Sequence, residues 1–136
     1  TYFVLTGEYS TLPWLASVVP FFLVNNLLLL NQYPDIKADT EVGRRHFPIA
    51  YGTGISNIMY ALFVLATIAS IFTGIILGYF PTLSLMALIP IPLAFYSLTG
   101  AIRHGESIGE YPQFLGANVL VSVLTPLLLA ISLLIG

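Results

Sequence analysis

The chain has 136 residues, of which 57% are hydrophobic and only 7% are charged, with a formal net charge of −2 and no cysteine. A soluble globular domain carries about 25% charged residues, so this composition excludes a soluble enzyme and a disordered chain. No basic surface is available for a nucleic acid, and neither disulfides nor thiolate metal sites can form. We therefore expect an integral membrane protein with a single transmembrane domain over residues 1–136.

Four apolar stretches are long enough, or nearly so, to cross a bilayer as helices, which requires about 20 residues. They cover residues 12–30, 55–77, 83–98 and 114–135. The third stretch is short and contains Pro90 and Pro92. The apolar residues 1–5 are too few to span a membrane, and we expect them to be the end of a further helix. The predicted fold is an all-α, polytopic membrane helix bundle.

All four Lys and Arg residues lie in the two long connections, residues 31–53 and 99–113. Since these connections are separated by two membrane crossings, they are expected on the same side of the membrane. The positive-inside rule assigns that side to the cytoplasm. We expect the protein in the inner membrane of a bacterial or archaeal cell, with both charged loops cytoplasmic.

Six of the charged residues fall within positions 35–45, and two of them, Asp35 and Asp39, are four residues apart. On a helical turn, side chains with this spacing share one face. Two carboxylates that cannot form a complete protein cage suit Mg²⁺, which keeps several waters and completes its shell with substrate phosphates. The pair therefore predicts a Mg²⁺ site for a lipid-like diphosphate.

Basic side chains near the acidic pair are candidates to bind the same diphosphate. They are Lys37, Arg44, Arg45 and, from the second charged loop, Arg103. Arg binds phosphate with a planar fork of donors, whereas Lys acts as a point charge. A charged loop is also what membrane topology alone demands, so the interpretation of this segment as an ordinary solvated loop stays open.

Residues 25–39 and 43–52, which include Asn25, Asn26, Gly43 and Arg44, resemble the second aspartate-rich motif of UbiA-type prenyltransferases. The similarity is greatest to the 1,4-dihydroxy-2-naphthoate polyprenyltransferase branch of menaquinone biosynthesis. It continues through Arg103 and residues 118–126.

The resemblance implies a nine-helix fold in which two aspartate-rich motifs face each other across a cavity. It also implies Mg²⁺-dependent transfer of a polyprenyl group from its diphosphate to an aromatic acceptor. Asp35 and Asp39 match the catalytic, metal-binding carboxylates of the second motif, and Asn31, one turn before Asp35, is a candidate auxiliary ligand.

Tyr33 and Asn57 are candidates to contact the cavity or the acceptor. The ring of Tyr33 can stabilise a cation, although tyrosines at a membrane surface are more often interfacial anchors. Asn57 follows the motif loop, but polar side chains in apolar helices usually bond to neighbouring helices. His46 and His104 are candidate proton acceptors or substrate contacts, although lone histidines in charged loops are more often ordinary polar surface residues.

The family's first motif, Asn-Asp-x-x-Asp-x-x-x-Asp, is absent from the sequence. The resemblance therefore implies a C-terminal portion with about four of the nine helices, and a partner segment that carries the first motif. We expect the chain to be inactive alone.

Two other functions are weighed against prenyl transfer. A phosphatidyl-group transferase is disfavoured because the chain has no Asp-Gly and Asn31 replaces the expected glycine before Asp35. The second is a non-catalytic four-helix membrane protein or a transporter fragment. A transporter is expected to place ionisable groups within the membrane, whereas the charges here lie outside the four apolar stretches.

Overall fold

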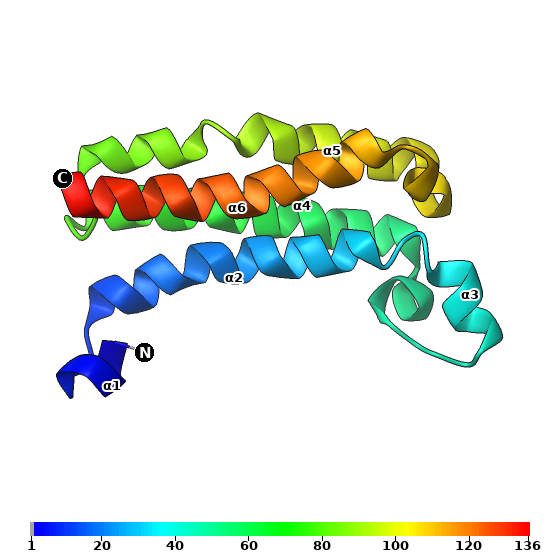
Figure 1. The fold of residues 1–136 in the computed structure, drawn as a ribbon, viewed down its shortest axis with the longest axis horizontal. Helices are drawn as coiled ribbons and strands as arrows, with labels where there is room; N and C mark the ends of the chain where they lie inside the picture. The colour runs from blue at the N-terminus through cyan, green and yellow to red at the C-terminus, as the bar shows by residue number, and fades with distance from the viewer. Residues whose placement is uncertain (1) are drawn as a thin grey trace.

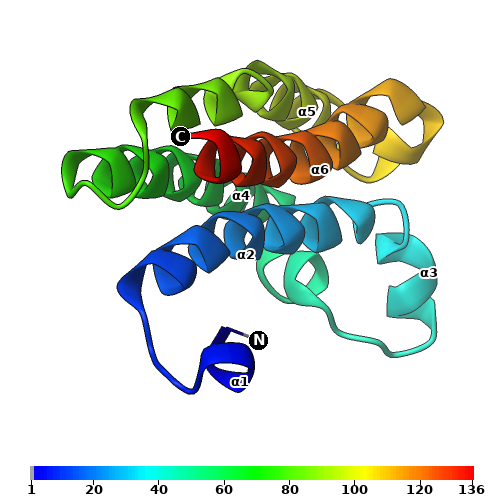
Figure 2. The ribbon, with the colours of Figure 1, turned by 60° about the vertical axis from the view of Figure 1, so that its left-hand side comes forward.

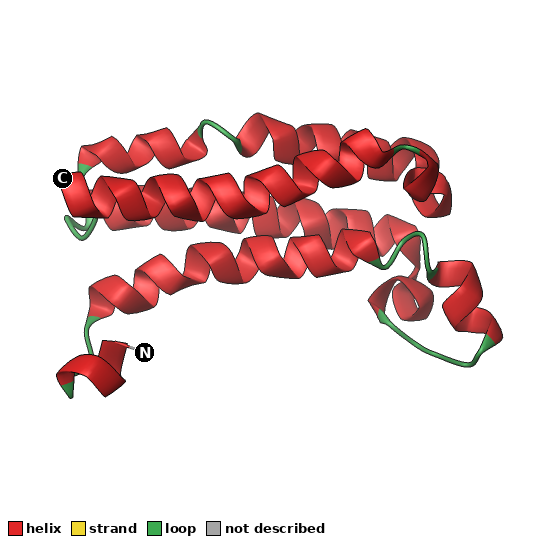
Figure 3. Cartoon of the chain, viewed as in Figure 1, coloured by secondary structure: helices red, strands yellow, loops and turns green. Residues whose placement is uncertain are grey.

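The computed structural model of the protein describes residues 2–136; Thr1, the first residue of the expected helix end, lies outside them. The chain is 84% helical, and no strand occurs within the described range (Figure 3). The all-α prediction is confirmed. The elements in chain order are α1 (Tyr2–Thr6), α2 (Thr11–Asn31), α3 (Ile36–Glu41), α4 (Phe47–Ile76), η1 (Thr82–Leu88), α5 (Ile91–His104), η2 (Gly105–Glu110) and α6 (Pro112–Ile135).

Four segments are long and apolar enough to cross a membrane, as predicted. They are Thr11–Asn31, Phe47–Ile76, Thr82–Glu110 and Pro112–Ile135. The long helices lie side by side in one bundle, and η1 continues into α5 along the same direction (Figure 1). The short helix α1 stands apart from this bundle on the side of α2 in both views (Figure 2).

The two charged connections lie at the same end of the bundle (Figure 1). One contains α3 and joins α2 to α4; the other contains η2 and joins α5 to α6. The short turn after α4 and the C-terminus lie at the opposite end. The predicted placement of both charged loops together is therefore observed.

The third span differs from the single helix predicted over residues 83–98. It consists of a 3₁₀ helix that ends at Leu88 and an α-helix that begins at Ile91 and continues to His104. Pro90 and Pro92 explain the break, because proline lacks an N–H and clashes with the preceding turn, but is well suited to the start of a helix.

The helical element that contains the second span begins before the predicted residue 55. Helix α4 starts at Phe47, and its backbone leaves the helical conformation at Gly52, where φ is 84° and ψ is 162°. This conformation is essentially restricted to glycine. Gly52 therefore marks a kink inside the element, and the five residues before the kink form a separate helical segment beside the charged loop.

A chain of buried polar groups joins three of the spanning helices. The Asn26 amide donates to the Tyr60 carbonyl at 3.1 Å, and the Tyr60 hydroxyl donates to Asn118 Oδ1 at 2.7 Å. The Asn118 amide in turn donates to the Asn26 carbonyl at 3.3 Å. These bonds link α2, α4 and α6, because a polar group in an apolar environment must find a partner inside the protein.

Candidate functional site

The acidic pair lies on one turn at the start of α3. Asp35 is the residue that precedes the helix, and its carbonyl accepts a hydrogen bond from the Asp39 N–H at 2.8 Å. The two residues are therefore one helical turn apart, as predicted. Asp35 is exposed, whereas the side chain of Asp39 is only 20% exposed.

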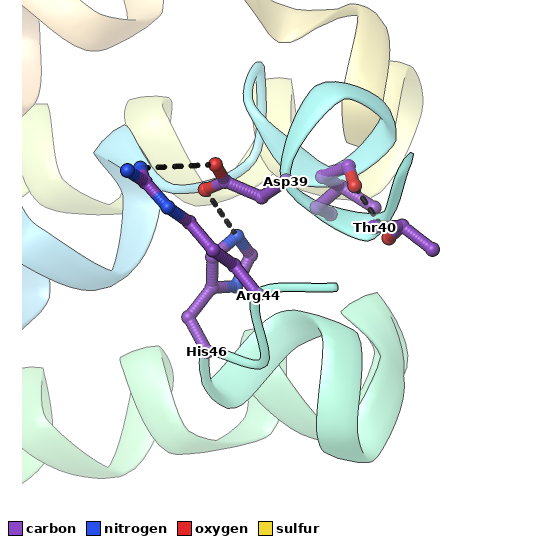
Figure 4. Close-up of polar contacts among 5 residues, drawn as sticks. Asp39, Thr40, Arg44 and His46 are labelled. Atoms are coloured by element: carbon purple, nitrogen blue, oxygen red, sulfur yellow. Dashed lines mark hydrogen bonds and ion pairs between the residues drawn. The ribbon is translucent and has the colours of Figure 1, made fainter. Parts of the chain in front are cut away.

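Asp39 is the point where α3 meets the segment that leads into α4 (Figure 4). Its Oδ1 lies 3.4 Å from Arg44 Nη1, and its Oδ2 lies 3.4 Å from His46 Nε2. The turn between them contains Gly43 at a φ of 78°, a left-handed conformation that favours glycine. The Arg44 N–H also donates to the Asp39 carbonyl at 2.9 Å, which holds the turn closed.

His46 is the site residue whose position the sequence did not reveal. Its side chain is 13% exposed, and within residues 2–136 neither ring nitrogen makes a hydrogen bond. The 3.4 Å approach to Asp39 is an electrostatic contact without hydrogen-bond geometry. The only signal in the sequence was its place two residues after Arg44, which did not separate it from a surface histidine.

The other predicted diphosphate-binding residues do not join Asp39. Lys37 lies two positions away on α3, and residues at that spacing do not face each other on a helix. Lys37 instead lines a separate hollow of about 460 Å³ with Glu106 and Glu110 of η2. Arg45, in the connection between α3 and α4, and Arg103, in the last turn of α5, are both exposed.

Tyr33 and Asn57 contact each other. The Tyr33 side chain is fully buried, and its hydroxyl donates to Asn57 Oδ1 at 2.6 Å, with the Thr53 carbonyl a second acceptor at 3.3 Å. Burial raises the pKa of Tyr33 to about 12, so the phenol remains a donor at neutral pH. Contact of either residue with a substrate stays a prediction. The predicted ligand Asn31 is exposed at the end of α2.

A hollow of about 270 Å³ lies between α2 and α4, and its lining includes residues next to the connection that contains α3. Its wall includes Asn25 and Leu28 of α2 and Gln32 just after that helix, together with Phe47, Met59 and Phe63 of α4. The hollow is mainly apolar, with two amide side chains among its lining residues. Such a lining can accept a hydrocarbon chain and still offer hydrogen-bond partners to a polar group.

The fit of Mg²⁺ depends on the donors available. No group of three or more His, Asp or Glu residues close enough to hold a metal occurs within the described range, residues 2–136. Two carboxylates are nevertheless what Mg²⁺ commonly takes from a protein when phosphate oxygens and waters complete its shell. Asp35 and Asp39 thus offer ligand types that Mg²⁺ accepts, and binding of Mg²⁺ by them stays a prediction.

A comparison with models of known protein families identifies the family of this chain. A family model described as the UbiA prenyltransferase family matches residues 1–119, so the chain belongs to this family. The match confirms the family recognised in the sequence, and it implies prenyl transfer in general, from prenyl diphosphates to aromatic substrates. Neither the curated proteins nor the solved structures contain a match to the chain.

Proposed function

We propose that this chain carries the second aspartate-rich motif of a Mg²⁺-dependent enzyme that transfers a polyprenyl group from its diphosphate to an aromatic acceptor. The family match over residues 1–119 is the observation that carries the proposal. The geometry supports it, because Asp39 and Arg44 are adjacent in the connection that contains α3, and the apolar hollow between α2 and α4 is lined in part by residues next to this connection.

The reaction requires an allylic C–O bond to break, with the bonding electron pair remaining on the diphosphate. A ring carbon of the acceptor forms the new C–C bond and then releases its leaving group, in the simplest case a proton. Negative charge grows on the diphosphate in the transition state, so fixed positive groups nearby accelerate this step.

Arg44 has the position for this role. Its side chain is 75% exposed and its guanidinium lies against the Asp39 carboxylate, so it can reach a diphosphate beside α3 without a change in backbone. Asp35 and Asp39, with Asn31 as an auxiliary oxygen ligand, would hold Mg²⁺, which neutralises charge on the leaving diphosphate when it is bound. Lys37, Arg45 and Arg103 would add positive potential at the same end of the bundle.

The allylic cation that remains must be protected from water until the ring attacks. The hollow between α2 and α4 offers apolar walls for this purpose. We propose a dihydroxynaphthoate as the acceptor, which is a menaquinone-type reaction, on the basis of the sequence resemblance around residues 25–52. The charged loops would face the cytoplasm, because they contain all the Lys and Arg residues.

The family resemblance implies a second acidic motif that shares in binding the Mg²⁺ and the diphosphate. The support is that Asp35 and Asp39 find no third acidic or histidine partner for a metal in the described part of the chain. We propose that the first aspartate-rich motif faces them from another segment of the enzyme. The 136 residues alone are then expected to form no product.

The test is product formation by the complete enzyme from a labelled polyprenyl diphosphate and a dihydroxynaphthoate. Asp35→Asn and Asp39→Asn should each lower the rate by about 10²- to 10³-fold, as loss of one strong electrostatic contact to a transition state commonly does. Glu41→Gln, which removes an exposed carboxylate from the same short helix, is the matched control. Full activity in both aspartate variants would refute the proposal, as would an inactive Glu41→Gln variant that binds prenyl diphosphate normally.

A non-catalytic membrane protein or a transporter fragment is the alternative. It predicts no product from the complete enzyme with any prenyl diphosphate and aromatic acceptor. No contact described above favours it over prenyl transfer.

A further inference from the structure

The Tyr33 phenol connects the acidic turn to helix α4. Tyr33 lies two residues before Asp35, in the short connection between α2 and α3. Its carbonyl accepts a hydrogen bond from the Ile36 N–H at 3.3 Å, so the backbone of Tyr33 forms part of the turn that starts α3. Its side chain points into the protein, where it is fully buried.

The residues that accept hydrogen bonds from the Tyr33 hydroxyl lie directly after the kink in α4. Gly52 breaks the helix, and Thr53 and Asn57 are on the first turns after the break. The 2.6 Å bond from the Tyr33 hydroxyl to Asn57 Oδ1 therefore joins the acidic turn to the membrane-spanning part of α4, not to the short segment before the kink. The Ser56 hydroxyl donates to the Gly52 carbonyl at 2.8 Å, on the first turn after the kink.

The segment that carries Arg44 and His46 is placed differently. It lies between two glycines with positive φ, Gly43 at 78° and Gly52 at 84°, at which the chain changes direction. Asp39 and Arg44 are joined locally by the turn at Gly43, through the backbone bond at 2.9 Å and the side-chain contact at 3.4 Å. The position of this whole unit against the membrane-spanning part of α4 is a separate matter, and the Tyr33 bond bears on it.

We propose that Tyr33 is a positioning residue for the acidic pair: its hydrogen bond to Asn57 fixes the turn that carries Asp35 and Asp39 against α4, so that both carboxylates can face a shared ligand with Arg44. The functional part of this inference rests on the proposed prenyl transfer, whereas the structural part does not. A buried phenol has one hydrogen to donate, and its removal leaves Asn57 Oδ1 without that partner.

The structural part is tested by the distance between α3 and α4. Because the sequence contains no cysteine, spin labels can be placed at Glu41→Cys on α3 and Leu62→Cys on α4, both exposed positions, in an otherwise unlabelled protein. Pulsed electron–electron double resonance in lipid nanodiscs then measures the distance distribution. We expect Tyr33→Phe to widen this distance distribution about twofold, since the turn that starts α3 loses its hydrogen bond to Asn57.

Three further variants make the distance measurement specific. Asn57→Leu removes the acceptor and should widen the distribution like Tyr33→Phe, so the inference remains testable if one variant does not fold. Asn57→Asp keeps an oxygen acceptor and should retain the narrow distribution. Tyr9→Phe removes an 88% exposed hydroxyl at the other end of the bundle while keeping a ring to stack on Phe3, and it should leave the distribution unchanged.

The functional part is tested in the complete enzyme through its response to Mg²⁺. Tyr33→Phe should raise the Mg²⁺ concentration for half-maximal rate about tenfold, because a lost buried hydrogen bond loosens the carboxylate pair. The rate at saturating Mg²⁺ should fall much less. A role limited to overall stability would lower the amount of active enzyme without moving the Mg²⁺ midpoint.

The outcomes separate this inference from the proposed function. An unchanged distance distribution in both Tyr33→Phe and Asn57→Leu overturns the inference, whatever the enzyme does. If Tyr33→Phe widens the distance distribution but leaves the Mg²⁺ concentration for half-maximal rate unchanged, the positioning role is overturned. The bond from Tyr33 to Asn57 is then purely structural. If the wild-type complete enzyme forms no prenylated product, the proposed function fails, and the distance measurement still decides whether the phenol holds α3.

Discussion

Asp39 has one carboxylate oxygen near Arg44 and the other near His46, both at 3.4 Å. A carboxylate in this position can exchange a weak contact with an exposed guanidinium for a stronger one with a divalent cation. Arg44 would then be free to bind the diphosphate that the cation brings. Ion pairs with one exposed partner contribute little to stability, about 0–1 kcal/mol, so the Asp39–Arg44 contact costs little to break.

Arg44 is expected to contribute more to diphosphate binding than Arg45 does. Arg44→Gln should raise the KM for the prenyl diphosphate about tenfold, the effect of losing one charge-assisted contact, and Arg44→Lys should retain most of the affinity. Arg45→Gln is the matched comparison, since Arg45 is exposed and forms no ion pair in the described part of the chain. Steady-state kinetics of the complete enzyme measure both, and an equal effect of the two glutamine variants would contradict the assigned geometry.

At the scale of the elements, hydropathy predicts the four spans well because bilayer thickness sets the length of each apolar run. The details that shape the site depend on backbone conformation. The sequence placed the start of the second span after Gly52, because two nearby glycines normally interrupt a helix, and it could not reveal that Phe47 begins a helical segment on the other side of the kink. Hydropathy likewise did not reveal that the third span changes from a 3₁₀ helix, which ends at Leu88, to an α-helix, which begins after Pro90.

Close packing of α5 on α6 depends on a glycine. A methyl group at Gly100 would overlap the ring of Phe114, whereas at Gly116, which is also inside a helix, it would meet nothing within 4 Å. Gly100→Ala should therefore lower the free energy of unfolding by about 1–3 kcal/mol, the usual cost of overpacking. Gly116→Ala should be neutral or slightly stabilising because alanine favours the helix.

Unfolding of both glycine variants in detergent, followed by circular dichroism, measures the difference. Equal stability of the two variants would show that α5 and α6 are not packed through Phe114 as described. Since this contact lies at the charged end of the bundle, its loss is also expected to loosen the connection that contains η2.

At the scale of the whole molecule, the sequence correctly predicted that the acidic motif and the second charged loop share one end of the bundle. It predicted the spacing of Asp35 and Asp39 because four residues make about one helical turn. The family resemblance placed Arg44, which follows Gly43, at the family's basic position, whereas distance in sequence alone favours Lys37, which lies between Asp35 and Asp39. The turn at Gly43 and the direction of α3 select Arg44 and turn Lys37 toward η2.

The interaction of Tyr33 with Asn57 lay equally beyond the sequence. Both residues were recognised as candidates near a site, but their pairing across 24 positions depends on the packing of the α2–α3 connection against α4. Long-range side-chain contacts of this kind follow from the tertiary fold and leave no local pattern.

The central claim is that Asp35 and Asp39 bind a prenyl diphosphate through Mg²⁺. Its most direct test is equilibrium binding of a fluorescent prenyl diphosphate analogue to the complete enzyme, with and without Mg²⁺. We expect the wild type to bind about a hundredfold more tightly with Mg²⁺ and the Asp35→Asn/Asp39→Asn variant to lose most of this dependence. Equal affinity with and without Mg²⁺ in the wild type, or an unchanged Mg²⁺ dependence in the variant, would contradict it.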